Sequence, residues 1–179
     1  NLNYARYKPL TYLEDIPKEA ASLMVSQRNM SGFMKSILVK RLESSFEAFK
    51  KTLNRFIKSY MRFIDMCEAG EVYISKKVDV YDLLDNGDDE KLMELVEEDT
   101  VQHYPTGAFS KDFIPALKHD LRMLKELQDQ WEEIIDDPKK EQFLLELKQR
   151  PELMDNKIII FTESRETAEY VGAYLELHY

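Results

Sequence analysis

The sequence predicts a mainly α-helical protein built on a long antiparallel helical hairpin, followed by a terminal β-α unit from an incomplete Rossmann-like lobe. Two long segments repeat apolar residues at alternating spacings of four and three, which is typical of packed helices. A continuous apolar run near the C-terminus then precedes a helical pattern, which indicates a buried parallel strand. Only 5 Gly and 6 Pro occur among 179 residues, which argues against an all-β plan.

The first long helix is predicted over residues 31–70, with Ser31 as its N-cap and Gly70 as its stop. Its apolar seam consists of Leu42, Phe46, Phe49, Leu53, Phe56, Tyr60, Phe63 and Cys67. From Phe33 to Arg62 eight Lys or Arg stand against two Glu, about +6 in a chain of net charge -9. The helix therefore combines an apolar seam with a basic face.

The segments before this helix are expected to be shorter. Residues 1–14 are predicted as an extended segment laid on the core. Pro17 fits the first position of a short helix, which residues 28–32 should end.

An acidic insert is predicted over residues 71–109. Residues 71–100 hold eleven acids and three Lys, about -8. Within the insert we expect a short strand at Val72–Ser75 without an obvious mate, a turn at 85–89, a short acidic helix at 90–98 and a loop at 103–107. The insert therefore looks peripheral to the hairpin.

The second long helix is predicted to begin near Pro115 and to run to about Ile135. Its seam consists of Leu117, Leu121, Leu124, Gln128, Trp131 and Ile135, with Gln128 as the one polar member. Two such seams joined by a connector of roughly 40 residues suit an antiparallel pair. Asp137-Pro138 then opens a third helix, Lys139–Gln149, whose inward residues are Phe143, Leu144 and Leu147.

The last segment changes pattern. Ile158–Phe161 reads as a strand buried on both faces. Residues 162–164 turn the chain into a helix with Ala168, Val171 and Leu175 on one face. Because an unpaired buried strand is costly, we expect this strand to pair with a second copy as a homodimer.

Self-contained catalytic chemistry is not indicated. The sequence has no Gly-x-x-x-x-Gly-Lys-Ser/Thr loop, and Asp88-Asp89-Glu90 follows a turn and not a strand. Three scattered His and one Cys make no zinc set. The lone Cys67 lies on the seam as a buried, unreactive thiol, and single-cysteine usage fits a reducing cytoplasm. No apolar run reaches the length of a membrane span.

Two blocks of the sequence resemble a known family. Asp137–Lys140 with Leu144 and Leu147, followed by Lys157–Arg165 and Thr167 to Tyr170, resembles the entry to the second RecA-like lobe of superfamily-two helicases. The end of this strand, Ile160-Phe161-Thr162, is similar to the family's motif IV. Residues 38–49 resemble a block in bacterial Swi/Snf-like helicases, in which helical protrusions emerge between the two motor lobes.

The resemblance implies an internal fragment of an ATP-dependent DNA helicase or translocase. Residues 1–136 would form the helical protrusion with its insert at 71–109, and residues 137–179 the start of the second lobe. The family's Walker A, Walker B and arginine finger have no counterpart here, so ATP and magnesium are implied for the parent and no cofactor for this chain. The implied partners are DNA, or RNA, and the rest of the helicase chain, with no membrane.

The same resemblance leads us to expect nucleic-acid contacts, because a motor that moves along a duplex places cations against the phosphates. The candidates on the basic face are Lys40, Arg41, Lys51, Arg55, Lys58 and Arg62. Thr162, Ser164 and Arg165 could bind a phosphate at a helix N-terminus. The alternatives are a solvated basic face, or one docked on acidic residues 79–99, and for Arg165 a surface ion pair with Glu169. At the level of the whole chain, the alternative is a non-catalytic helical interaction or self-association module.

Overall fold

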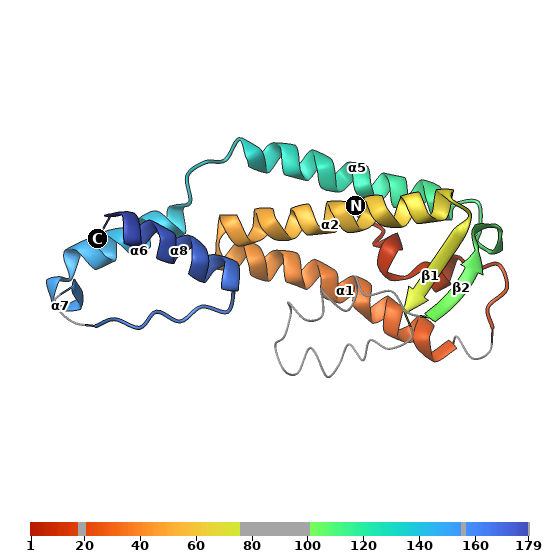
Figure 1. Cartoon of the computed structure of the whole chain (residues 1–179), viewed down its shortest axis with the longest axis horizontal. Helices are drawn as coiled ribbons and strands as arrows, with labels where there is room; N and C mark the ends of the chain where they lie inside the picture. Colours follow the sequence, from red (N-terminus) through yellow and green to blue (C-terminus); the bar gives the residue numbers. More distant parts are fainter. Residues whose placement is uncertain (18–20, 76–100, 155–156, 179) are drawn as a thin grey trace. The chain divides into compact units, whose positions relative to one another are not determined.

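The computed structural model describes residues 1–17, 21–75, 101–154 and 157–178, and it is mainly helical with one small antiparallel sheet. The elements are η1 (Ala5–Tyr7), η2 (Pro9–Tyr12), α1 (Ala21–Ser44), α2 (Phe46–Glu68), β1 (Glu71–Ser75), β2 (Val101–Pro105), η4 (Thr106–Ala108), α5 (Phe113–Glu132), α6 (Pro138–Gln149), α7 (Pro151–Met154) and α8 (Arg165–His178) (Figure 1). None of the helices described here combines the length and apolar character that a transmembrane span requires.

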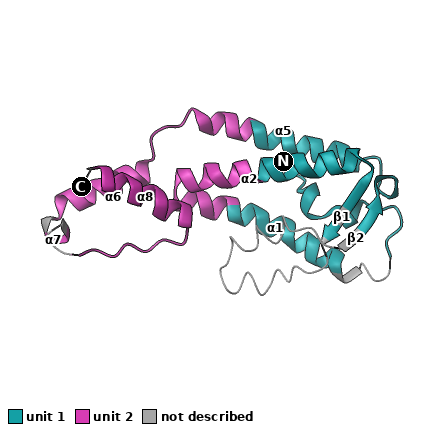
Figure 2. Ribbon diagram, in the orientation of Figure 1, with its two compact units in different colours: residues 1–37, 56–125 teal, residues 38–55, 126–179 magenta. Residues whose placement is uncertain are grey.

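Two compact units make up the chain (Figure 2). Unit 1 consists of residues 1–37 and 56–125, and unit 2 of residues 38–55 and 126–179. Helices α1, α2 and α5 each contribute residues to both units. Unit 2 therefore combines residues from both of the domains that the sequence predicts.

The predicted single helix over residues 31–70 is wrong. Helix α1 ends at Ser44, α2 begins at Phe46, and the chain reverses direction at Ser45 (Figure 1). The Ser45 hydroxyl accepts the N–H of Ala48 at 3.1 Å, so it caps α2. Serine competes for backbone groups in this way, which favours helix ends over helix interiors.

The predicted break at residues 28–32 is also wrong, because these residues lie inside α1. Ser31 is no N-cap: its hydroxyl donates to the carbonyl of Arg28 at 2.8 Å within the helix. The described part of this helix begins at Ala21, after Pro17 and the residues outside the described range.

The pairing predicted for the two long seams is seen in part, because α2 and α5 contact each other in antiparallel order, whereas Leu42 lies in α1 and Ile135 lies beyond α5 and is exposed. In unit 1 the Tyr60 hydroxyl donates to Asp120 at 3.0 Å, and the rings of Phe63 and Phe113 lie 6.1 Å apart. A later residue of α2 thus meets an earlier residue of α5, as an antiparallel pair requires. The α2 seam is buried at Phe49, Leu53, Phe56, Tyr60, Phe63 and Cys67.

The N-terminal segment lies on the core of unit 1, as expected, but as two 3-10 turns and not as an extended chain. The fully buried carboxylate of Asp120 accepts the backbone N–H groups of Asn3 and Ala5. The ring of Tyr7 packs on Phe56, with centroids 5.8 Å apart. One buried carboxylate thereby fixes the start of the chain to α5.

Strand β1 has a mate that the sequence did not predict. It pairs antiparallel with β2 from Glu71 opposite Pro105 to Ser75 opposite Val101, so the loop predicted at 103–107 is partly strand. Gly70, with φ 98°, ends α2, and its carbonyl accepts the N–H of Thr106 at 2.9 Å. The turn predicted at 85–89, the helix at 90–98 and the acidic residues 79–99 lie outside the described residues.

The strand predicted at Ile158–Phe161 is not formed. These residues have no regular secondary structure, and all four side chains are exposed. A strand needs a neighbour for its backbone hydrogen bonds, and the two described strands pair with each other. A Rossmann-like unit is therefore not seen, whereas the helices predicted on either side are confirmed as α6 and α8.

Candidate functional site

An ion triad centred on the buried carboxylate of Glu166 connects α8 to α1 and α2 within unit 2. The carboxylate of Glu166 receives Arg41 Nη1 at 3.4 Å on one oxygen and Arg55 Nη2 on the other. The side chains of Arg41 and Glu166 are each 4% exposed, and that of Arg55 is 38% exposed. The hydroxyl of Ser164 donates to the same carboxylate at 2.9 Å.

The charge state of Glu166 follows from opposing influences on its pKa. Burial, the largest, raises the pKa, but the residue's own backbone N–H, Ser164, Arg55 and Arg41 together outweigh it and lower the pKa. The carboxylate is therefore ionised at neutral pH. Two guanidinium groups against one carboxylate leave the triad with one excess positive charge.

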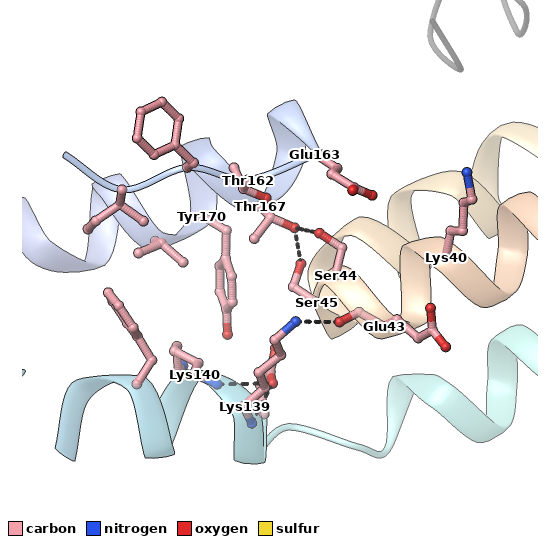
Figure 3. Close-up of a pocket in the computed structure, with 15 residues that line it drawn as sticks. Lys40, Glu43, Ser44, Ser45, Lys139, Lys140, Thr162, Glu163, Thr167 and Tyr170 are labelled. Carbon is pink, nitrogen blue, oxygen red and sulfur yellow. Dashed lines mark hydrogen bonds between the residues drawn. The ribbon is translucent and has the colours of Figure 1, made fainter. Parts of the chain in front are cut away.

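A cluster of hydroxyls forms the second contact between α8 and the α1–α2 junction. Thr167 Oγ1 lies 2.7 Å from Ser44 Oγ and 2.8 Å from Ser45 Oγ (Figure 3). Ser45 and Thr167 are buried. The two serines therefore form the junction between α1 and α2 and its contact with α8.

Asp137 holds the starts of two helices. One carboxylate oxygen accepts the backbone N–H groups of Lys139 and Lys140 at the start of α6, at 3.1 and 3.3 Å. The other accepts the N–H of Phe46, the first residue of α2, at 3.1 Å. The side chain is buried, so a single carboxylate serves two helix N-termini, where negative charge is favoured.

A pocket of about 580 Å³ lies in unit 2 among the α1–α2 junction, α6, α8 and residues 160–163 (Figure 3). Its charged lining is balanced and consists of Lys40, Lys139, Lys140, Glu43, Asp137 and Glu163. Lys139 Nζ donates to the carbonyl of Glu43 at 2.5 Å. A hydrogen bond with Tyr170 raises the pKa of Lys140, whose Nζ also lies 5.1 Å from the centre of that ring.

The pocket shows no arrangement for nucleophilic catalysis. The hydroxyls of Ser44, Ser45 and Thr167 bond to one another, and no histidine is among the lining residues. These hydroxyls instead form hydrogen bonds between α8 and the α1–α2 junction. Across the described ranges, no set of three or more His, Cys, Asp or Glu is grouped as a metal site would require.

The cations predicted to contact nucleic acid have two different surroundings. Arg41 and Arg55 meet at Glu166, although they come from different helices. The other predicted cations are exposed, namely Lys40 on α1 and Lys51, Lys58 and Arg62 on α2. Lys51 also pairs with Glu47 one turn earlier, with 3.5 Å between Nζ and Oε1.

The predicted phosphate site at the start of α8 is occupied by groups of the chain itself. Ser164 is buried, and its hydroxyl accepts the N–H of Thr167 at 3.3 Å. The carboxylate of Glu166 takes the position that an anion would have at this helix N-terminus. Thr162 is exposed, and its hydroxyl accepts the N–H of Ser164. Arg165 forms the surface ion pair with Glu169 that the sequence left open, at 2.9 Å.

The sequence did not predict the roles of three residues that organise this region, namely Asp137 as a double cap, Glu166 and Thr167. Asp137 precedes Pro138, a signal for an N-cap that the sequence does carry. Glu166 and Arg41 are 125 positions apart, and no local pattern connects them. Cys67 is buried as expected, and burial raises the pKa of its thiol to about 11.

Comparison with known proteins gave no match to any family model, curated protein or solved structure.

Proposed function

We propose that this chain is an internal helical region of an ATP-dependent DNA helicase or translocase of the Swi/Snf-like type. In this role it contributes nucleic-acid contacts and couples the motor lobes, without catalysis of its own. ATP and magnesium are assigned to other segments of the parent protein, because the chain lacks a Walker A loop. The proposal starts from the resemblance of residues 38–49 and 137–170 to that family.

The observation that carries the coupling role is the anchoring of α8 and α6 on the α1–α2 junction. All of these residues belong to unit 2, although the sequence assigns them to two domains divided at residue 136. The Glu166 triad and the Asp137 double cap are buried contacts between the two predicted domains. A buried ion pair is favourable only in a strict geometry, so its two partners move together. Such contacts suit a region that transmits movement from one motor lobe to the other.

The nucleic-acid role is assigned to the exposed cations. Lys51, Lys58 and Arg62 follow one another along α2 at intervals of seven and four, so they share one face of that helix. Lys40 lies near the end of α1 and is also exposed. We assign Arg41 and Arg55 to coupling instead, since their guanidinium groups meet Glu166.

The incomplete Rossmann-like lobe remains part of the proposal. In the parent, neighbouring strands would lie beside Lys157–Phe161 and convert it to a strand, with α8 as the following helix. The continuous apolar run supports this role, because strands buried on both faces have this composition.

The test of nucleic-acid contact is duplex DNA binding by the 179-residue chain, measured by fluorescence anisotropy at several salt concentrations. The triple variant K51E/K58E/R62E should weaken binding and lower the slope of log K against log salt by about 2 to 3. The control is K35E/K125E/K148E, which changes the net charge equally at exposed lysines off this face. Equal loss in both variants, or no loss in the first, would refute the assignment. The same titration with duplex RNA distinguishes the two nucleic acids.

A self-association module is the second candidate, and one observation favours it. The exposed apolar side chains of Ile158–Phe161 offer a contact surface in the chain as it stands. Reading the flanking coding sequence separates the two: the helicase requires a P-loop upstream and an arginine-bearing motif downstream.

A further inference from the structure

The pocket of unit 2 has the size of a small-molecule site and an aromatic wall. Its volume of about 580 Å³ lies within the range of roughly 300–1,000 Å³ that is usual for ligand pockets. Every lining residue belongs to unit 2. The aromatic wall consists of Phe143, Phe161 and Tyr170, and Ile160 and Val171 add aliphatic surface. This part of the lining suits the faces and edges of a flat ring, because aromatic rings pack favourably on one another.

The polar part of the pocket is held in place by contacts within the chain. The buried carboxylate of Asp137 accepts three backbone N–H groups, and the buried hydroxyls of Ser45 and Thr167 bond to each other. The cap at Asp137 fixes the first turn of α6, from which Lys139 and Lys140 extend. A ligand would therefore meet these two cations on a backbone that is already ordered, which lowers the entropic cost of binding.

Lys139 and Lys140 carry positive charge that no described carboxylate pairs with. Lys139 Nζ donates to the backbone carbonyl of Glu43 at 2.5 Å, and the ammonium group of Lys140 forms a hydrogen bond with Tyr170. Both partners are uncharged, and neither lysine forms an ion pair within the described ranges. An ammonium group has three N–H donors, so each lysine retains donors for an anion.

The acidic residues of the lining do not cancel this charge. Both carboxylate oxygens of Asp137 are engaged by the N-termini of α2 and α6, where negative charge is already compensated. Glu43 and Glu163 are exposed, and Figure 3 shows their carboxylates directed away from the ring of Tyr170. The part of the pocket lined by Tyr170 and the two lysines is therefore positive, which favours an anionic ligand.

We propose that this pocket binds a small, flat aromatic carboxylate. The carboxylate is held by the ammonium groups of Lys139 and Lys140, and the ring lies on the aromatic wall. This inference does not rest on the proposed function, because it uses only contacts within unit 2. A bound acid would contact both α6 and α8, and it would stabilise unit 2 because it binds the folded form.

The first test compares two ligands of equal ring size on the wild-type 179-residue chain by isothermal titration calorimetry. We expect 2-naphthoate to bind at a single site, and the cation 2-naphthylmethylammonium to bind at least about tenfold more weakly. A charge-assisted hydrogen bond is enough to give this ratio. The proposal is overturned if 2-naphthoate shows no saturable binding at millimolar concentration, or if the cation binds as tightly as the acid.

A double variant tests the two lysines. K139Q/K140Q should weaken the binding of 2-naphthoate about tenfold or more, because both charged donors are lost. The cap at Asp137 uses backbone N–H groups, so an unchanged circular dichroism spectrum is expected. The matched control is K51Q/K148Q, which removes two exposed lysines of unit 2 outside the pocket lining and should leave the dissociation constant unchanged. Equal dissociation constants in the two double variants would overturn the assignment.

A single variant tests the aromatic wall. F161A should weaken 2-naphthoate binding about threefold or more, because one ring contact is lost. Phe161 is 89% exposed, so the fold does not depend on this side chain. The control is L177A, which truncates another largely exposed apolar side chain of unit 2 outside the lining and should bind as the wild type does. If F161A binds 2-naphthoate as tightly as L177A, the ring does not lie on this wall and the proposal fails.

Discussion

Replacing Glu166 by Gln should destabilise unit 2 strongly. The substitution keeps the shape of the side chain but removes the charge that compensates the buried guanidinium of Arg41. Both side chains are 4% exposed, so water cannot take over this role. Breaking a buried pair by removing one partner costs about 3–5 kcal/mol. The pair with Arg55 adds at most about 1 kcal/mol, because that guanidinium is 38% exposed.

Trp131 provides the assay. It is the only tryptophan, it belongs to unit 2, and its ring lies 4.7 Å from that of Phe49 and 4.9 Å from that of Phe46. Urea denaturation at pH 7, followed by tryptophan fluorescence, therefore reports the unfolding of this unit. We expect the free energy of unfolding of E166Q to fall by about 3 kcal/mol or more.

Two further variants make this result specific. The double variant R41M/E166M removes both buried charges and should recover stability to within about 1 kcal/mol of the wild type. Glu169 is the matched control on the same helix, since its carboxylate is exposed and forms a surface ion pair with Arg165. E169Q should cost less than about 0.5 kcal/mol. The reasoning fails if E166Q is as stable as E169Q, or if the double variant is no more stable than E166Q.

The remaining predictions concern pH, the core of unit 1 and the hydroxyl cluster. The pKa of Glu166 in the folded chain is lowered below its ordinary 4.5. The ionised carboxylate therefore adds to the free energy of unfolding above pH 4.5, and this contribution is lost as pH falls through the folded pKa. Wild type and E166Q should consequently converge in stability when urea denaturation is repeated at acid pH. Asp120→Ala should cost about 3 kcal/mol in unit 1 and should expose the amides of Asn3 and Ala5 to fast hydrogen exchange, since it leaves both donors and Tyr60 without their acceptor. Cys67 should react with a disulfide reagent at pH 8 only after denaturant is added, because its thiol is buried and its pKa is about 11. Thr167→Val should cost about 1 kcal/mol in urea denaturation, because it leaves Ser44 and Ser45 without their shared partner.

The parts of the fold that the sequence did predict are those that depend on spacing. The alternation of four and three predicts which side of α2 is buried from Phe49 to Cys67, because burial in a helix pair follows the helical period. The start of α6 was also predictable, since Pro138 suits a first helical position. Such signals lie within a few residues of the features they determine.

The predictions that were wrong have a common cause: the structure at these positions depends on residues that are distant in the sequence. The reversal at Ser45 carried a weak local signal in the Ser44-Ser45 pair, but the apolar spacing continued across it and predicted one helix. The apolar run at residues 158–161 has the composition of a buried strand, but no strand is formed there, because a strand also needs a neighbour for its backbone hydrogen bonds. The triad joins Arg41 and Arg55 to a residue more than 110 positions later, so the sequence placed both arginines on a solvent-facing surface.

The double cap at Asp137 has a consequence for how the two helices lose order. The first turns of separate helices normally fray independently, each with its own end groups. Here the opening residues of α2 and α6 share one acceptor side chain, so an excursion that releases Phe46 also loosens the hold on Lys139. The two ends should therefore open as one event, with closely matched amide exchange rates, even though 91 positions separate Phe46 from its acceptor along the chain.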